Sequence, residues 1–585
     1  MNNYKKEIAI KIGGPAGFGI KSSGLILAES FFRAGLSVFG YSEYPSLIRG
    51  GHNSYQINAG ENNINSASIN IDVLIALNQE SIELHESELN PASIIIHDGL
   101  VIEKNIKASS LNIPLKKLAS NSGNELSKNT VAIGAAAFLA QLNLEKINEQ
   151  IKKIFGDKGK KIVDINKKAA KYGYEHASKA GVELKKIKLG YQPENNKGKN
   201  NLFITSNHAT ALGAIQAGCK LYSAYPMTPA SSIMHILAAK QKKYDMVVHQ
   251  TEDEISAIGV AIGAATTGVR AATGTSGGGF ALMTENLGLA AITETPLVII
   301  ESQRTAPATG LPTWTEQGDL QFVIRASHGE FPRIVIAPGD AEEAFYMIQN
   351  AFNLAEKFQV PVIFLMDKMI SESDFSCFKL DYKAVQIKRE EFLSENELER
   401  GGEYKRYRIT KTGISKRVLP GQKGGVHLIN SDDHDEYGFS TEDSKQRINM
   451  MDKRFKKIPL IEADIPEPIL YGPKQADLTI VGWGSVKGAV LDAIEQIRNS
   501  NQDSKKSINF VHLTYLWPFP AKRMKAILKR ASKIMLVENN KTGQLGDLIR
   551  QETGFKIKHK FLKYDGRPFF REEIIDKIKE IFKNY

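Results

Sequence analysis

The stretch EIAIKIGGPAGFG, residues 7–19, decides the fold class. Its apolar run at residues 7–12 predicts a short strand that ends in a glycine-rich turn, and a helical pattern follows to about Ala34. The alternation of strands and helices then continues through two apolar runs and an Ala-rich stretch, at residues 73–77, 93–97 and 131–141. The first part of the chain is therefore predicted to be an α/β domain.

Two further blocks of the chain repeat this alternation. The second block carries apolar strands at 298–302 and 360–367 and a predicted helix from Glu252 to Thr267, with small residues along one face. The last block carries predicted strands at 476–485, 508–516 and 533–540 and a predicted helix at 486–498. We predict the α/β class, with three α/β domains and a charged, turn-rich connecting region. The predicted limits are 1–189 for the first domain, 190–201 for a linker, 202–380 for the second domain, 381–470 for the connecting region and 471–585 for the third domain.

The composition limits the classes of function. Lys and Arg number 76 against 65 Asp and Glu, a net charge of +11, but the basic residues are dispersed and no nucleic-acid recognition motif accompanies them. No apolar run is long enough for a membrane span or a signal peptide. With only two cysteines, Cys219 and Cys377, the chain cannot ligate an iron–sulfur cluster by itself. We expect a cytoplasmic protein that binds neither nucleic acid nor membrane, and whose partner would carry any cluster.

Two glycine-rich stretches near the N-terminus each have two interpretations. GGPAGFG, residues 13–19, would cradle a phosphate with the backbone amides of a helix N-terminus, or would serve only as a tight turn. It lacks both the GxGxxG spacing and the terminal Gly-Lys-Ser/Thr of a P-loop. Arg49-Gly50-Gly51-His52 combines an anion-binding side chain with a flexible backbone, and is equally compatible with a turn.

Two motifs of the second block place polar groups on a constrained backbone. In Tyr225–Pro229 (YPMTP), two prolines fix the direction of the Thr228 hydroxyl, which suits a donor to a bound anion or substrate oxygen; a rigid structural turn explains the same pattern. Gln250–Glu254 (QTEDE) opens the predicted helix, where acidic residues usually cap the first turn. One carboxylate remains free, and a glutamate in an apolar setting would hydrogen-bond the ring nitrogen of an aminopyrimidine.

Two more motifs directly follow predicted strands. Thr275–Gly279 (TSGGG) and Gln303–Thr313 (QRTAPATGLPT) lie just beyond strand carboxyl ends, where ligands bind in open α/β sheets. Arg304 is the one side chain there suited to grip a carboxylate with two hydrogen bonds, as a substrate with a carboxylate next to its reacting carbonyl requires. An interdomain salt bridge is the alternative role for Arg304.

No histidine pair has metal-ligand spacing on a predicted helix. Two histidines and three aspartates are close in sequence, but their mixed donors select no metal. They are His427, Asp432, Asp433, His434 and Asp435. We predict a solvated loop there, and we assign no metal-binding residue to this chain.

Together, YPMTP, the acidic residues that open the helix, TSGGG and QRTAPATGLPT, in this order across residues 225–313, resemble the pyrimidine-binding domain of the 2-oxoacid:ferredoxin oxidoreductases. The leading block, with GGPAGFG and YPSLIRGG, resembles that family's gamma domain fused ahead of its alpha domain. Residues 471–585 resemble its transketolase C-terminal-like domain. This fused order is typical of the alpha subunit of the 2-oxoglutarate type, and the stretch from Lys411 to His427 is similar to that branch.

The resemblance implies a CoA-acylating oxidative decarboxylation of a 2-oxoacid, with 2-oxoglutarate as the first substrate and pyruvate or branched-chain 2-oxoacids as alternatives. Thiamine diphosphate would be the cofactor and coenzyme A the co-substrate, and electrons would pass through a [4Fe–4S] cluster to ferredoxin. The chain has no GDG motif followed by the asparagine with which thiamine enzymes hold the diphosphate through a metal. The diphosphate site, its Mg²⁺ and the cluster are therefore expected on a beta subunit, with the active site at the interface.

The resemblance also assigns roles to residues. Glu254 matches the glutamate that hydrogen-bonds N1′ of the thiamine pyrimidine, with Glu252 as the competing assignment. Thr228 matches the threonine of the family's YPITP motif, close to substrate and cofactor, and Arg304 matches the carboxylate-binding arginine. In the TSGGG motif, Ser276 and Gly277 are expected to bind the cofactor.

The sequence departs from the family's pattern at two positions, and two other classes of protein are alternatives to the family. Gly278 replaces the proline of the family's TSGPG, and Ser206–Ala209 (SNHA) stands where many relatives have GNEA, so no catalytic role is assigned there. A regulatory CoA- or nucleotide-binding module, built around GGPAGFG and RGGH, would bind nucleotide without a partner and would give Glu254 no role. A self-contained thiamine decarboxylase would need the diphosphate motif that is missing.

Overall fold

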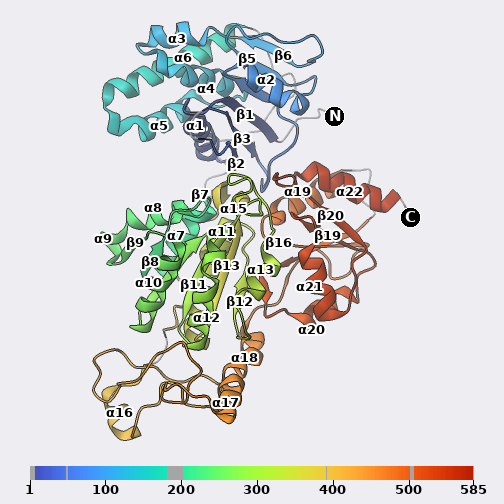
Figure 1. Cartoon of the computed structure of the whole chain (residues 1–585). Coiled ribbons are helices and arrows are strands. Elements are labelled where there is room, and N and C mark those ends of the chain that lie inside the picture. Colours follow the sequence, from blue (N-terminus) through green and yellow to red (C-terminus); the bar gives the residue numbers. More distant parts are fainter. Residues whose placement is uncertain (1–6, 48–49, 181–201, 390–391, 501–505, 584–585) are drawn as a thin grey trace.

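Three α/β domains and an extended connecting region make up the molecule (Figure 1). The computed structural model describes residues 7–47, 50–180, 202–389, 392–500 and 506–583. In Figure 1 the first domain lies at the top, the second below it and the third beside the second, while the connecting region extends from the bottom. The predicted α/β class with three such domains is confirmed. The predicted linker lies outside the described residues.

The first domain is built on an eight-stranded mixed sheet in the order β6-β5-β4-β1-β3-β2-β14-β7. Its strand β1 continues through Gly13 and Gly14, which the sequence pattern assigned to a turn, because both glycines pair with β3. The strands are β1 (Glu7–Pro15), β2 (Ser37–Glu43), β3 (His52–Gly60), β4 (Val73–Ala76), β5 (Ile94–His97), β6 (Ser109–Asn112), β7 (Leu202–Thr205) and β14 (Asp374–Cys377). The helices are α1 (Ile20–Arg33), α2 (Gln79–His85), α3 (Leu115–Ser122), α4 (Lys128–Leu139), α5 (Leu144–Phe155) and α6 (Lys160–Lys179), with one-turn 3₁₀ segments at Glu86–Glu88, Glu125–Ser127 and Gly156–Lys158.

Small residues bring two helices of this domain into backbone contact. A Cβ atom at Gly134 of α4 would overlap the carbonyl oxygen of Ala170 in α6, and one at Gly173 of α6 would overlap that of Val131. The Ala-rich stretch of the sequence therefore forms a buried helix that α6 covers at close range.

Two strands from the predicted second domain belong to the first sheet. β14 pairs antiparallel with β2 on one side and with β7 on the other. Both strands lie near the predicted limits, 202 and 380, of the second domain. Sheet membership thus crosses those limits, because hydrogen-bond partners far apart in sequence leave no local signal at either strand.

The second domain contains a seven-stranded sheet in the order β18-β12-β13-β11-β10-β8-β9, parallel except for β18. Helices cover both faces, which explains why β11 and β13 are buried at every position. The strands are β8 (Cys219–Ala224), β9 (Val247–Gln250), β10 (Arg270–Thr275), β11 (Leu297–Gln303), β12 (Ile334–Ile336), β13 (Pro361–Asp367) and β18 (Tyr515–Trp517). The helices are α7 (Ser206–Gln216), α8 (Ser231–Ala238), α9 (Gln241–Tyr244), α10 (Glu254–Thr266), α11 (Gly277–Leu282), α12 (Thr284–Ile292), α13 (Leu320–Arg325), α14 (Ala341–Phe358) and α15 (Lys368–Glu372).

The third domain has a five-stranded sheet in the order β15-β17-β16-β19-β20. The single strand expected at 508–516 is divided at Thr514: its first part is β17, and its last part, β18, joins the second sheet. The strands are β15 (Ile469–Tyr471), β16 (Leu478–Trp483), β17 (Ile508–Leu513), β19 (Ile534–Glu538) and β20 (His559–Leu562), and the helices are α19 (Val486–Asn499), α20 (Ala521–Leu528), α21 (Gln544–Thr553) and α22 (Arg571–Lys583). None of the helices in the described ranges has the length and apolar character needed to cross a membrane.

The connecting region holds three helices among irregular segments: α16 (Glu395–Gly401), α17 (Ser444–Phe455) and α18 (Lys457–Asp464). The prediction of a solvated loop at His434 is wrong. This side chain is fully buried, and its ring nitrogens lie 2.9 Å from the Asp435 carbonyl oxygen and 3.2 Å from that of Ile292. His434 therefore fastens the connecting region to the second domain at the end of α12.

A buried ionic cluster fastens the same region a second time. Glu294 accepts hydrogen bonds from Lys453 Nζ at 2.5 Å and Lys457 Nζ at 2.6 Å, and the three side chains are at most 1% exposed. Arg406 donates to the carbonyl oxygen of Glu294 at 2.9 Å. Burial alone would raise the pKa of Glu294, but the three cations lower it well below its usual range. One carboxylate thus compensates two buried ammonium groups.

We expect Glu294→Gln to open the connecting region locally, because it leaves both ammonium groups without a counter-charge. Removing one partner of a buried ion pair costs about 3–5 kcal/mol, so protected amides of α17 should exchange hydrogen roughly a hundred-fold faster or more. Glu436→Gln is the control, since the Lys405–Glu436 pair (2.8 Å) is partly exposed and worth less than about 1 kcal/mol. Unchanged exchange in the Glu294 variant would contradict the structural role.

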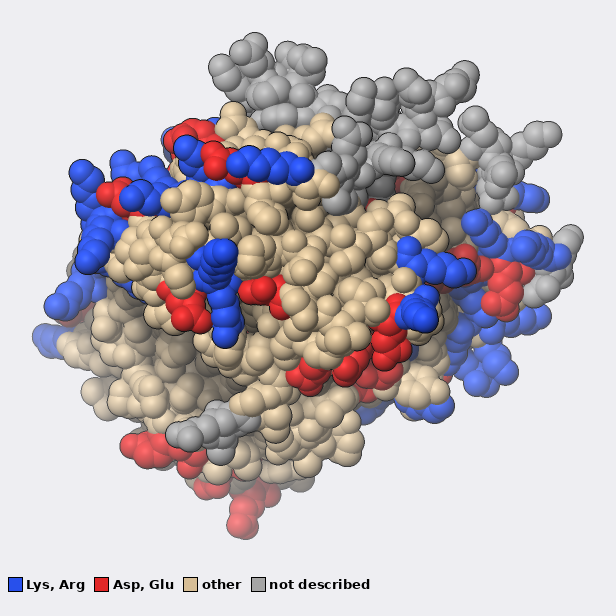
Figure 2. Space-filling model, turned by 90° about the horizontal axis from the view of Figure 1, so that it is seen from above, with Lys and Arg blue, Asp and Glu red and all other residues tan. Residues whose placement is uncertain are grey.

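Charged side chains on the face seen from above are interspersed (Figure 2). Lys and Arg gather at the flanks of this view together with Asp and Glu, and much of the central surface is uncharged. The net charge of +11 is thus not concentrated at the centre of this face.

Candidate active site

Four sequence motifs meet at one edge of the second sheet. They follow β8, β9, β10 and β11, which are neighbours in the order β11-β10-β8-β9 and run parallel. The carboxyl ends of parallel neighbours lie along the same edge, so YPMTP, TEDE, TSGGG and the loop that begins with Arg304 are brought together. The candidate active site is built on this edge.

Glu254 is the buried carboxylate of the site. It is the first residue of α10, whose N-cap is Asp253: the Asp253 Oδ1 accepts a hydrogen bond of 2.7 Å from the Ser256 amide. Because Asp253 caps the helix, Glu254 is free for another role; it is 3% exposed, and its Oε1 has no hydrogen-bond partner among the described residues. Burial raises its pKa. Glu252, the competing residue, is exposed.

Arg304 and Thr228 are in direct contact. The Arg304 Nη1 donates a hydrogen bond of 3.0 Å to the carbonyl oxygen of Thr228, and the buried Nε atom has no partner within the described part of the chain. Burial lowers the pKa of Arg304, and the nearby Glu254 carboxylate acts in the opposite direction. The structure therefore brings three predicted residues together: Thr228, Glu254 and Arg304.

Ser276 and Gly277 lie at the start of α11, directly after β10. Ser276 is fully buried, and its Oγ atom has no hydrogen-bond partner among the residues that the structure describes. A Cβ atom at Gly277 would overlap the Asp319 carboxylate, and one at Gly279 would overlap Glu254. By contrast, nothing lies within 4 Å of the position a Cβ would take at Gly278, so the departure from TSGPG leaves open space.

Hydrogen bonds and a ring contact hold these motifs in place. Asn207 donates hydrogen bonds of 2.8 Å to the Pro229 carbonyl oxygen and the Ser232 hydroxyl, which anchors the YPMTP turn. Thr313, in the loop after Arg304, donates to the Tyr44 carbonyl oxygen at 2.6 Å. Arg567 of the third domain stacks on the next residue, Trp314, 3.2 Å from the ring centroid. All three domains thus contribute to the position of this loop.

The two glycine-rich stretches of the first domain are not part of this site. The first, GGPAGFG, lies beside a separate cavity, and the second, RGGH, is only partly described by the structure. In GGPAGFG, Gly17 and Gly19 have φ values of 84° and 73°, which a tight turn requires. A cavity of about 660 Å³ adjoins this turn and is lined by Ser22, Lys128 and Lys158 among others. Arg49 of the second stretch lies outside the described residues. His52 Nε2 lies 2.9 Å from His85 Nε2.

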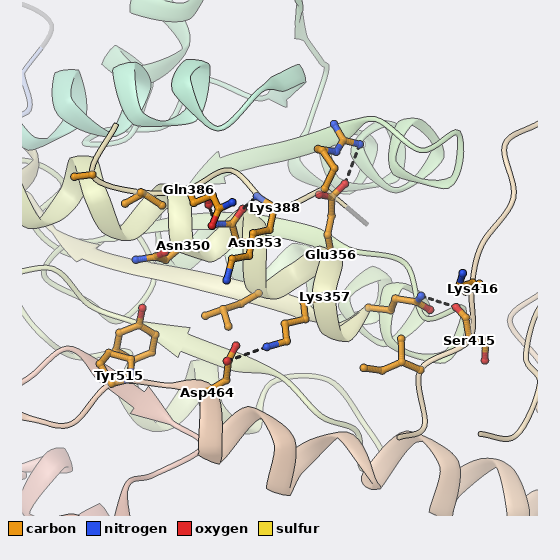
Figure 3. A pocket seen from close by; sticks show the side chains of 17 residues that line it. Asn350, Asn353, Glu356, Lys357, Gln386, Lys388, Ser415, Lys416, Asp464 and Tyr515 are labelled. Atoms are coloured by element: carbon orange, nitrogen blue, oxygen red, sulfur yellow. Dashed lines mark hydrogen bonds and ion pairs between the residues drawn. The ribbon is translucent and has the colours of Figure 1, made fainter. Parts of the chain in front are cut away.

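A larger cavity, of about 710 Å³, lies apart from the four motifs (Figure 3). Side chains of α14, of residues 384–389 and of residues 414–416 line it, together with Asp464 and Tyr515. Two ion pairs join side chains of its lining: Lys357 lies 2.8 Å from Asp464, and Glu356 lies 2.9 Å from Arg389. None of Thr228, Glu254 and Arg304 lines this cavity.

Comparison with known proteins identifies the domains. Residues 212–453 match the family described as "Pyruvate flavodoxin/ferredoxin oxidoreductase, thiamine diP-bdg". Residues 9–176 match "Pyruvate ferredoxin/flavodoxin oxidoreductase", and residues 476–573 match "Pyruvate:ferredoxin oxidoreductase core domain II". The first of these segments contains all four motifs of the candidate site.

Relatives that match over nearly the whole chain show which family it belongs to. The alpha subunit of a 2-oxoacid:ferredoxin oxidoreductase from Saccharolobus solfataricus is 34% identical over 98% of each chain. The alpha subunit of 2-oxoacid:ferredoxin oxidoreductase 2 from Aeropyrum pernix is 32% identical over 99% of this chain and 98% of its own. The chain belongs to the 2-oxoacid:ferredoxin oxidoreductases. It is an alpha subunit of this family of oxidoreductases, as the resemblance of the motifs predicted.

Two other relatives of this alpha subunit are named for 2-oxoglutarate. The 2-oxoglutarate oxidoreductase subunit KorA of Mycobacterium tuberculosis is 28% identical over 97% of this chain and 90% of its own. A solved structure, "2-oxoglutarate:ferredoxin oxidoreductase from Magnetococcus marinus with 2-oxoglutarate, coenzyme A and succinyl-CoA bound", has a TM-score of 0.91 and 31% identity over 98% of this chain and 99% of that one. The fold of the alpha subunit is thus shared over nearly its full length.

The residues of the site fit an aminopyrimidine cofactor. A buried carboxylate oxygen without a partner, on Glu254, is what the ring nitrogen of an aminopyrimidine would bind. Overlap between Glu254 and any side chain at Gly279 shows that this carboxylate packs directly on the TSGGG backbone. The described residues contain no group of three or more His, Cys, Asp and Glu side chains arranged to hold a metal ion.

Proposed function

We propose that this alpha subunit, together with a beta subunit, catalyses the thiamine-dependent, CoA-acylating oxidative decarboxylation of a 2-oxoacid. Electrons pass to ferredoxin through a [4Fe–4S] cluster, and 2-oxoglutarate is the preferred substrate, giving succinyl-CoA and CO₂. The observation that carries this proposal is the buried, unpartnered carboxylate oxygen of Glu254, which lies at the carboxyl edge of a parallel sheet near a partly buried arginine. Pyruvate and branched-chain 2-oxoacids are the alternative substrates.

Glu254, Thr228, Ser276 and Gly277 are proposed to hold the aminopyrimidine end of thiamine diphosphate. Bound there, the cofactor would supply the carbanion-stabilising chemistry that decarboxylation of a 2-oxoacid needs. The Glu254 carboxylate exchanges a proton at N1′ of the pyrimidine, and its burial keeps water from competing for this hydrogen bond. Asp253 supports this role, because it caps α10 in place of Glu254.

Arg304 is proposed to bind the carboxylate of the 2-oxoacid. Its Nη1 atom donates to the Thr228 carbonyl oxygen, and its Nε atom has no partner among the described residues. The Nε–H group is therefore available as a donor to a carboxylate. Thr228 is half-exposed beside it and is proposed to contact both substrate and cofactor. The preference for 2-oxoglutarate is supported by the names of two relatives and by the ligands in the Magnetococcus marinus structure.

The beta subunit is proposed to carry the diphosphate site with Mg²⁺ and the iron–sulfur cluster. The two cysteines of this chain, Cys219 and Cys377, are both buried and lie in two different sheets. Beside the site, α10 presents an exposed stripe of Ile255, Gly259 and Gly263, and nothing lies within 4 Å of a Cβ position on either glycine. We propose that the beta subunit packs on this stripe and closes the site.

The proposed function is tested by co-purifying the chain with its native partner and assaying CoA-dependent reduction of a viologen dye without oxygen. We expect turnover of 2-oxoglutarate only when a cysteine-bearing partner is present. Turnover of pyruvate at a higher specificity constant than 2-oxoglutarate would change the substrate. Nucleotide binding by the isolated chain, with no 2-oxoacid consumed in any complex, would favour the regulatory module instead.

The proposed contact between the beta subunit and the α10 stripe leads to a separate prediction. We expect Gly263→Trp to reduce co-purification of the beta subunit and turnover by roughly a hundred-fold, because a large side chain inside a packed interface costs several times RT. The chain itself should fold normally, since open space surrounds this position. Gly401→Trp is the control, because Gly401 is equally open but lies in the connecting region, at the end of α16. Normal assembly of the Gly263 variant would place the partner elsewhere.

Coenzyme A is proposed as the co-substrate, with its phosphates at the cavity beside the GGPAGFG turn. Lys128 and Lys158 line this cavity, and the N-terminus of α1 follows Gly19 directly. These features also fit the alternative role of a nucleotide-binding regulatory subunit, which the viologen assay distinguishes.

A further inference from the structure

Glu301 is a buried acid with no donor beside it. It lies near the carboxyl end of β11, is 0% exposed, and neither of its carboxylate oxygens has a hydrogen-bond partner in the described ranges. The sequence pattern VIIES, residues 298–302, predicts only an apolar strand at this position. An ionised carboxylate in this position would be costly, because it would lose its hydration without any compensating hydrogen bond.

Asp319 is an acid held at the same end of β11. Its backbone amide donates a hydrogen bond of 2.9 Å to Gln303 Oε1, and Glu301 is in register with Thr275, the residue before Ser276. Asp319 directly precedes α13, yet its side chain does not cap that helix, and its buried Oδ2 atom is unpartnered within the described residues. Two buried acids that have no other donor beside them are stabilised when one of them is protonated. Burial and then Asp319 raise the pKa of Glu301 well above its usual range, whereas burial raises the pKa of Asp319 to about 6. Of the two acids, Glu301 therefore favours the protonated form more strongly.

Asp319 in turn packs on the turn at Ser276–Gly279. Its Oδ2 atom occupies the space that a side chain at Gly277 would fill. Within the same turn, Glu254 occupies the space that a side chain at Gly279 would fill. The turn thus packs against two carboxyl groups, one of which is the proposed cofactor-binding Glu254.

We propose that Glu301 and Asp319 share one proton and that this pair positions the Ser276–Gly279 turn, and through it Glu254, for the cofactor. The inference rests on the proposed function, because the turn is assigned to the cofactor there. Glu301 and Asp319 are positioning residues: neither is assigned a contact with substrate. Glu316 and Asp367 are the other acids that act on the pair, and both favour the protonated form.

The shared proton is tested on the chain by infrared spectroscopy at pH 9. We expect the C=O stretch of a protonated carboxyl group in the wild type and its loss in Glu301→Gln, because burial and Asp319 favour the protonated form of Glu301. Two other buried acids, Glu538 and Asp374, have pKa values of about 7 and about 6 and are ionised at this pH. Asp374→Asn is the matched control: it alters a buried acid that accepts a 2.7 Å bond from Tyr55, and the band should remain. A wild type without the band at pH 9 would overturn the shared proton.

The positioning role is tested by hydrogen exchange and by thiamine diphosphate affinity in the complex with the beta subunit. Glu301→Gln keeps a donor to Asp319, so exchange of the amides in α11 and the dissociation constant should stay within about threefold of the wild type. Glu301→Leu removes the donor, so both should rise by about tenfold or more. If the leucine variant does not fold, Asp319→Ala, which removes the acceptor, should produce the same change in exchange and affinity.

The outcomes separate the two proposals. If the wild-type complex binds no thiamine diphosphate while the infrared band behaves as expected, the proposed function fails and the proton pair stands. If the complex binds the cofactor and Glu301→Leu or Asp319→Ala leaves both exchange and affinity unchanged, the positioning role is overturned while the proposed function stands.

Discussion

Glu254→Gln should lower the turnover of 2-oxoacid by about a hundred- to ten-thousand-fold, because the carboxylate is assigned the proton exchange at N1′ of the cofactor and general acid–base groups contribute 10²–10⁴-fold. Glutamine has the same shape and still forms hydrogen bonds, so the complex with the beta subunit should assemble normally. The loss is measured as kcat in the anaerobic viologen assay. Assembly is measured by co-purification and gel filtration.

The matched control for Glu254 is the nearby glutamate Glu252. Glu252→Gln alters an exposed carboxylate two residues away, and its kcat should remain within about twofold of the wild type, as for most surface substitutions. The reverse result, with Glu252→Gln inactive and Glu254→Gln active, would assign the pyrimidine contact to Glu252. Normal turnover of both variants would remove this helix from the catalytic site.

Arg304→Lys should lower kcat/KM for the 2-oxoacid by about a hundred-fold or more, since lysine cannot offer the planar pair of donors that a carboxylate accepts. The effect should fall mainly on KM, because the same carboxylate contact is present in the ground state and in the transition state. Steady-state kinetics over a range of 2-oxoacid concentrations measures this split.

Arg325→Lys is the control for Arg304. Arg325 lies in the same domain and donates a hydrogen bond of 2.7 Å to Gln551, but its guanidinium is exposed. Its kinetic constants should be unchanged. A fall in kcat with constant KM in the Arg304 variant would indicate that the arginine orients the YPMTP turn, through its bond to the Thr228 carbonyl oxygen, instead of binding substrate.

The sequence was sufficient to place the site because its motifs are tied to strand ends. Each motif directly follows an apolar run, and parallel strands gather their carboxyl ends at one edge whatever the order of the strands. The helix that begins at Glu254 was also predictable, since acidic residues precede a run of small and apolar residues. What could be predicted was therefore the part of the site that local pattern encodes.

The remaining features depend on contacts between distant residues. Glu301 and Asp319 lie in separate segments, and nothing near either residue indicates that they interact. The burial of His434 depends on Ile292 in α12, 142 positions earlier in the chain. An acid within an apolar strand, as in VIIES, was the one available signal, because a buried carboxyl group requires a partner or a proton.

The exchange of strands between domains has a consequence for how this protein avoids aggregation. If the first domain were made as a separate chain, β2 would be the edge of its sheet, with seven residues of unpaired backbone. In this chain β14 pairs with Phe39 and Gly40 in the middle of that edge, and the outer strand of the sheet is β7, which is only four residues long and half-buried. Fusion of the two domains thus places a short strand at the edge of the sheet in place of a long one. A separately encoded first domain would need another chain to pair with its edge strand.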